Sequence, residues 1–174
     1  NRLPVPEFAG AAIRRVFESV ARVLLDLPHE LLTVSAPDRP LLRVLTGLAE
    51  GADRIAASEA LLLRGRPQGP EVELQSVLPF PREESRSDFE TASSVAEFEE
   101  LLASSSAVLE LDGSHGEPGD AAAERSYEYM GEMLLRSCDL LVALWDGGPS
   151  RGRGGSVFIL QRARSLGIPV VWVD

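Results

Sequence analysis

Apolar residues along this chain follow two alternating patterns. In some stretches they recur every three to four residues, which predicts amphipathic helices. Others are short and almost wholly apolar, which predicts buried strands. The patterns predict helices over residues 8–27, 52–63, 94–104, 120–137 and 155–166, and strands over residues 41–46, 72–78, 107–111, 139–145 and 169–173. Such alternation is typical of a parallel α/β fold.

Local signals set several boundaries. The first helix carries apolar residues at Phe8, Ala12, Val16, Val20, Leu24 and Leu27. Ser94 to Glu97 matches a capping box that opens a helix ending near Ser104. Gly167, with Pro169 just beyond it, ends the last helix. The polar stretch 82–94 and the loop 113–119 are candidates for mobility.

The fold class that follows is a three-layer, Rossmann-like α/β domain covering residues 1–174, with a mainly parallel sheet of about five to six strands. Such a domain normally opens with a strand, but none precedes Phe8. Either Leu31 to Ser35 supplies it, or the first strand lies upstream of Asn1 and is missing from this chain. We favour the second alternative.

The charged residues of the chain limit the partners and the chemistry that it can have. The chain has 17 basic and 27 acidic residues, for a net charge of −10, which disfavours nucleic acids and anionic membrane surfaces as partners. All the basic residues are arginine, so a Walker-type phosphate loop and Schiff-base chemistry are excluded. A phosphate ligand would be held by backbone N–H groups, helix N-termini, arginines or a metal.

Histidine and cysteine are scarce. Two histidines, His29 and His115, rule out a multi-histidine zinc site, and no protein metal site is predicted. His115, in a polar loop, is expected to be solvated. Cys138 is expected to be a buried structural thiol in a reducing compartment. No signal peptide or membrane-spanning run is visible, so we expect a cytoplasmic protein without membrane contact.

The first candidate site follows the strand at 41–46. Gly47, Leu48, Gly51, Asp53 and Arg54 lie in a glycine-punctuated turn that enters a helix. Glycines permit close backbone approach, and a helix N-terminus offers unpaired N–H groups and a positive dipole end. The turn either binds an anion or is simply a tight connection.

The second candidate site follows the strand at 139–145. It contains Trp145, Asp146 and Gly147, and then Arg153, Gly154, Gly155 and Ser156 at the start of another helix. Arginines among glycines at a helix N-terminus suit an anion, although a solvated surface loop is the alternative. Two such turns in one chain strengthen the prediction of phosphate binding.

Other side chains are expected near the same edge of the sheet. Asp146 could hold a ribose hydroxyl, a water or a divalent metal, or cap its own turn. Trp145 could stack on a base or pack in the core, and Arg82 follows the rigid corner at Pro79 to Pro81. Glu50 and Asp146 are the candidate catalytic carboxylates.

The motifs at 47–53, 78–81, 138–147 and 152–156 together resemble the SLOG superfamily, which joins the Smf/DprA proteins with the Lonely Guy phosphoribohydrolases. The Trp-Asp-Gly version is similar to uncharacterised bacterial members. The resemblance implies a nucleotide-binding, Rossmann-like domain that often forms dimers and acts as a ligand sensor fused to an effector module.

The resemblance also bears on catalysis. Lonely Guy enzymes carry a glutamate that acts in cleavage of an N-glycosidic bond, and alignment at Gly155 and Ser156 places Ile159 there. The expected function is therefore binding of a nucleotide or nucleotide-derived phosphate ligand, with or without a divalent metal. Whether the protein is an enzyme stays open; the alternative is a nucleoside-phosphate N-glycoside hydrolase.

Overall fold

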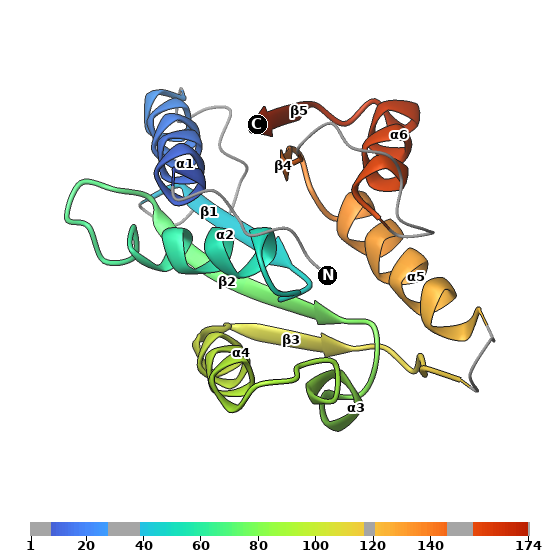
Figure 1. The fold of residues 1–174 in the computed structure, drawn as a ribbon. Helices are drawn as coiled ribbons and strands as arrows, with labels where there is room; N and C mark the ends of the chain where they lie inside the picture. Colours follow the sequence, from blue (N-terminus) through green and yellow to red (C-terminus); the bar gives the residue numbers. More distant parts are fainter. Residues whose placement is uncertain (1–7, 28–38, 117–120, 146–154, 174) are drawn as a thin grey trace.

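The computed structural model describes residues 8–27, 39–116, 121–145 and 155–173 (Figure 1). Helices and strands alternate over most of this length. In chain order they are α1 (Ala9–Asp26), β1 (Leu41–Thr46), α2 (Ala52–Leu61), β2 (Glu71–Leu78), α3 (Arg82–Arg86), α4 (Ala92–Ser104), β3 (Ala107–Glu110), α5 (Ala122–Arg136), β4 (Leu141–Leu144), α6 (Ser156–Leu166) and β5 (Val170–Val173). The predicted α/β class is confirmed.

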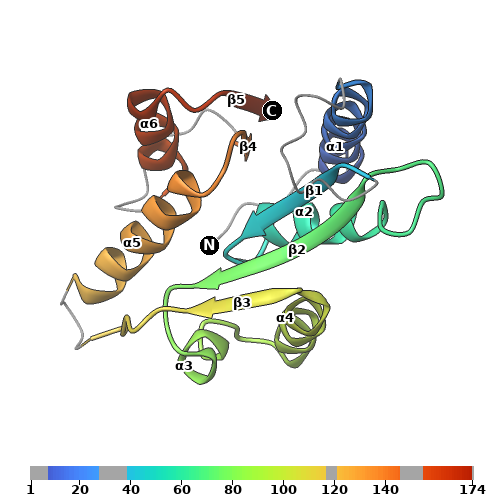
Figure 2. The same cartoon turned by 180° about the vertical axis from the view of Figure 1, so that it is seen from behind.

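The described strands form two parallel sheets rather than one. The first has the order β1-β2-β3, with Leu41 opposite Glu71 and Gln75 opposite Ala107. The second pairs β4 with β5, and Leu141 lies opposite Val170. Viewed from either side, β1 is the strand of the first sheet that lies nearest to the second (Figures 1 and 2). The predicted parallel pairing is therefore confirmed within each sheet.

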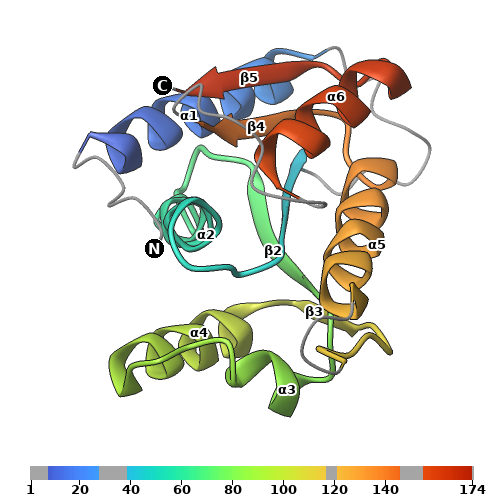
Figure 3. The same cartoon turned by 45° about the vertical axis from the view of Figure 1, so that its right-hand side comes forward.

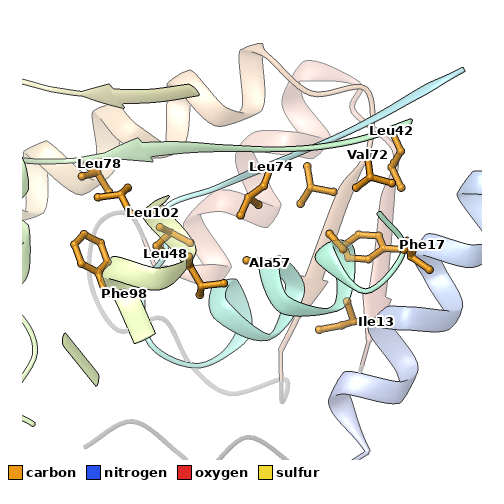
Figure 4. Close-up of a cluster of buried hydrophobic side chains, with 14 residues drawn as sticks. Ile13, Phe17, Leu42, Leu48, Ala57, Val72, Leu74, Leu78, Phe98 and Leu102 are labelled. Atoms are coloured by element: carbon orange, nitrogen blue, oxygen red, sulfur yellow. The ribbon is translucent and has the colours of Figure 1, made fainter. Parts of the chain in front are cut away.

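Helices cover both faces of the first sheet. Helix α2 packs on one face of β1 and β2, and α5 lies on the other (Figure 3). The main core lies on the α2 side, where α1, α2 and α4 meet the sheet (Figure 4). It includes Phe17, Leu74 and Phe98, all at most 5% exposed. Burying each such side chain contributes about 1.5–3 kcal/mol.

The predicted first helix is confirmed as α1. Its buried face carries Ala9, Ile13, Phe17 and Ala21, and Val20 and Leu24 of the predicted apolar stripe pack against the core while partly buried. Helix α4 begins at Ala92 rather than at a capping box on Ser94, because Thr91 Oγ1 accepts a hydrogen bond from Ser94 N at 3.1 Å. The polar stretch 82–94, a candidate for mobility from its sequence, contains the short helix α3.

Candidate functional site

The first glycine turn is held in shape by its own side chains. Asp53 Oδ2 accepts a hydrogen bond from Gly47 N at 3.1 Å, and Thr46 Oγ1 accepts one from Leu48 N at 3.1 Å. Leu48 is fully buried with φ at 55°, and Gly51 has φ at 96°. A positive φ at a buried leucine is a strained conformation of the kind that collects at functional sites.

Two helices start at glycines beside this region. Gly51 is the N-cap of α2 and Gly155 is the N-cap of α6, and neither cap makes a side-chain hydrogen bond. The N–H groups in the first turn of a helix have no acceptor within the helix, and the helix dipole adds partial positive charge there. Both helix starts therefore have the chemistry of an anion site.

One cavity of about 820 Å³ joins the two turns. At the carboxyl edge of the sheets it is lined by residues of both, namely Gly47, Ala49, Glu50, Asp53, Gly155 and Ser156. The deeper part is apolar and is walled by β1, β4 and the helices α1, α5 and α6. Its volume lies within the range typical of small-molecule sites.

Helix α5 closes the cavity from the other side. A Cβ on Gly47 would lie 2.9 Å from Met130 Sδ, so the thioether packs directly on the first turn. A Cβ on Gly131 would collide with Ile159 Cδ1. Ile159, at the position where the resemblance expects a glutamate, thus lines the cavity and packs tightly on α5.

The buried Arg54 side chain links the first glycine turn to α4. Its side chain is 2% exposed and lies over the Phe89 ring, 4.2 Å from the centroid. Nε donates to Leu48 O at 3.1 Å, and Nη1 donates to the backbone and hydroxyl oxygens of Ser94 and to Glu97 Oε2, each at 2.9 Å. The guanidinium therefore ties the strained turn to α4. Its Nη2 is buried and has no hydrogen-bond partner among the described residues.

The other predicted side chains are arranged differently. Arg82 forms an ion pair with Glu99, and Glu50 accepts a hydrogen bond from the Ser94 hydroxyl. Glu50 lines the cavity, whereas Arg54 and Arg82 are not among its described lining residues. The Trp145 ring stacks on Trp172 at 5.2 Å, and the Trp172 indole donates to Trp145 O at 2.7 Å.

Four predicted residues, Asp146, Gly147, Arg153 and Gly154, lie outside the described residues. Their part in the site stays a prediction. The described end of the second turn, Gly155 and Ser156, does share the cavity with Gly47 and Asp53. The described parts of the two glycine turns therefore line the same cavity.

A second polar cluster, which the sequence did not indicate, lies at the same edge. His115 Nδ1 contacts Glu84 Oε1 at 3.0 Å, and Nε2 contacts Asp88 Oδ1 at 2.7 Å. Tyr127 donates to Asp88 Oδ2 at 2.6 Å, and the His115 ring packs on Phe80 with centroids 4.2 Å apart. Asp88 and Tyr127 also line the cavity. His115, expected to be solvated, is 35% exposed, but both of its ring nitrogens contact carboxylates.

Two titrating groups are shifted. Partial burial lowers the pKa of His115, but the hydrogen bonds and negative charges of Asp88 and Glu84 together outweigh it, so the pKa is raised above 6.5. Burial, followed by the charge of Asp139, raises the pKa of the Cys138 thiol. A thiol with a raised pKa forms little thiolate at neutral pH, which agrees with the structural role expected for Cys138.

No protein-family model matches the chain, and a search of curated proteins finds no relative. Within the described ranges, no group of three or more histidine, cysteine, aspartate or glutamate side chains is placed to hold a metal ion. No helix in the described parts of the chain is both long and apolar enough to cross a membrane.

Proposed function

We propose that this protein binds a nucleotide or a nucleotide-derived phosphate ligand in the cavity between the two glycine turns, as a sensor or regulatory module. One observation carries the proposal: two helix starts capped by glycine, α2 and α6, border the same cavity. In this proposal the domain is a Rossmann-like member of the SLOG superfamily, whose ligands sit at the carboxyl edge of the strands.

The two helix starts differ in charge, which orients the ligand. Asp53 lies in the first turn of α2 and already accepts the Gly47 N–H, so that side offers a carboxylate. The first turn of α6 contains no acidic residue. The phosphate therefore belongs at Gly155 and Ser156, and the carboxylates of Glu50 and Asp53 suit the hydroxyl groups of a sugar.

The substitution Ser156→Asp tests this orientation. An aspartate at the first position of a helix is favoured by the helix dipole, so folding should be unharmed. The same carboxylate would repel a phosphate, and we expect at least about a tenfold loss of affinity, or about 1.4 kcal/mol. Isothermal titration calorimetry with AMP, ADP, ATP and NAD measures it.

Ser165→Asp is the matched control, because Ser165 is exposed in the last turn of the same helix. It should leave nucleotide affinity unchanged. If Ser156→Asp folds normally and binds as tightly as the unmodified protein, the phosphate does not sit at α6. If none of the nucleotides binds or raises the melting temperature of the unmodified protein, the proposed function fails.

Hydrolysis of an N-glycosidic bond is the second candidate, because the Glu50 carboxylate lines the cavity. That carboxylate would stabilise the positive charge that develops on the sugar. Chromatography of nucleotides incubated with the protein tests it. Release of free base that is lost in Glu50→Gln supports an enzyme, and no release at high protein concentration leaves binding alone.

A further inference from the structure

The Glu50 carboxylate at the edge of the cavity is held by a side chain from another helix. Ser94, in the first turn of α4, donates its hydroxyl hydrogen to Glu50 Oε1, although the two residues lie 44 positions apart in the chain. Glu50 lines the cavity, whereas Ser94 is not among its described lining residues. Ser94 therefore acts on the orientation of Glu50 without bordering the described wall of the cavity.

Arg54 fixes the direction of this hydrogen bond. A serine hydroxyl has one hydrogen to donate, a guanidinium only donates, and an ionised carboxylate only accepts. Because Arg54 Nη1 donates to Ser94 Oγ at 2.9 Å, the single hydroxyl hydrogen of Ser94 is directed to Glu50. The donors thus form a chain that runs from Arg54 through Ser94 to Glu50.

The same guanidinium also holds the backbone on both sides of the contact. Arg54 Nη1 donates to Ser94 O at 2.9 Å, and Nε donates to Leu48 O at 3.1 Å, two residues before Glu50. A buried charge costs desolvation energy, so its hydrogen-bond partners show what it holds in place. Here they are the segment that carries Glu50 and the residue that binds its carboxylate.

Asp53, the other carboxylate at this edge, is bound differently. Its Oδ2 accepts the N–H of Gly47 at 3.1 Å, a bond within the glycine turn itself. Glu50 is instead bound from outside the turn, at Oε1. A carboxylate has about four lone-pair sites, so this bond is compatible with further bonds from the hydroxyl groups of a ligand.

We propose that Ser94, held by Arg54, is a positioning residue that fixes the Glu50 carboxylate toward the sugar hydroxyl groups of the ligand. The site then prefers nucleotides that carry both ribose hydroxyls over nucleotides that lack one. The inference rests on the proposed function, which places the phosphate at α6 and the sugar beside Glu50. A site built to bind a hydroxyl rejects an analogue without it, because a polar group of the site is left unpaired.

Isothermal titration calorimetry with AMP, 2′-deoxy-AMP and 3′-deoxy-AMP tests the inference. The unmodified protein should bind AMP at least about tenfold more tightly than one of the two deoxy analogues. Ser94→Ala has no hydroxyl to direct Glu50, so this ratio should fall to about threefold or less. The affinity for that deoxy analogue should change by less than about twofold, because it makes no bond to the carboxylate that is lost.

Ser104→Ala is the matched control. Ser104 lies in the last turn of the same helix, and its hydroxyl donates to the backbone oxygen of Glu100. This variant should keep the full preference for AMP. Glu50→Gln should lower the ratio as Ser94→Ala does, and the double variant should lower it no further, because Ser94 acts through Glu50.

Three outcomes would overturn the inference while the proposed function stands. The first is an unmodified protein that binds AMP and both deoxy analogues equally well. The second is an unchanged ratio in Ser94→Ala. The third is an equal loss of affinity for AMP and the deoxy analogues in Ser94→Ala, because Ser94 would then support the site as a whole. If the unmodified protein binds no nucleotide, the proposed function itself fails.

Discussion

At the residue scale, His115 is the side chain whose surroundings give it the clearest pH dependence. Its two ring nitrogens contact Glu84 and Asp88, and this contact joins the loop after β3 to α3. Because the pKa is raised above 6.5 in the folded protein, protonated His115 stabilises the fold. That contribution is fully present below about pH 6.5 and is lost as the pH rises through the folded-state pKa.

We therefore expect His115→Gln to destabilise the protein more at pH 6 than at pH 9. Thermal unfolding of both proteins across this range measures the difference, and glutamine keeps a polar side chain of similar reach. A gap in melting temperature that is the same at both pH values would contradict a charged His115.

Arg54 gives the second prediction at this scale. Arg54→Met should lower the free energy of unfolding by on the order of 3 kcal/mol, because Leu48 O and the Ser94 oxygens lose their donor inside the protein. Arg66→Ala is the control, since its ion pair with Glu18 is exposed and worth less than about 1 kcal/mol. Urea unfolding compares the two. Similar losses of unfolding free energy in both variants would contradict this structural role of Arg54.

At the element scale, the contact of α5 with α6 depends on Gly131, because glycine has no side chain to separate the helices. A methyl group there would strike Ile159 Cδ1. In Gly131→Ala, overpacking of about 1–3 kcal/mol therefore opposes a helix-propensity gain of about 1 kcal/mol. Ile159→Val removes the colliding atom, so the double variant should recover the propensity gain.

A double-mutant cycle of urea unfolding free energies measures this coupling, which we expect to reach about 1 kcal/mol or more. Additive effects of the two substitutions would show that α5 and α6 are not in close contact at this point. Gly65→Ala serves as a control, since no other group lies within 4 Å of its Cβ position and only its φ of 76° opposes the change.

Helix boundaries show how neighbouring elements override a local signal. Ser94 and Glu97 match a capping box, but both side chains bind Arg54 of α2 instead, and Thr91 caps α4. In α1 the apolar positions allow two adjacent stripes, and packing against α2 and the sheet selects the one with Ile13 and Phe17. Neither choice can be made from the segment alone.

At the scale of the whole molecule, the two sheets should differ in stability. Val72, Leu74, Val77 and Leu78 of β2 are buried and β2 is paired on both sides, whereas β4 is half-buried and, among the described strands, is paired with β5 alone. Amide exchange should be slowest in β2 and clearly faster in β4, as hydrogen–deuterium exchange can measure. Equal protection in both strands would mean that the sheets open as one unit.

The sequence by itself determined the α/β class, the strands and the first glycine turn, because periodicity, runs of apolar residues and glycine act over a few neighbouring positions. The bounds of β1, Leu41–Thr46, were predicted to the residue. Only the tertiary structure decided that Arg54 links the first glycine turn to α4 instead of lining the cavity. It also decided that the ring of His115 contacts Glu84 and Asp88. Those partners lie 27 to 43 residues apart in the chain, and contacts at such separation depend on how the elements pack.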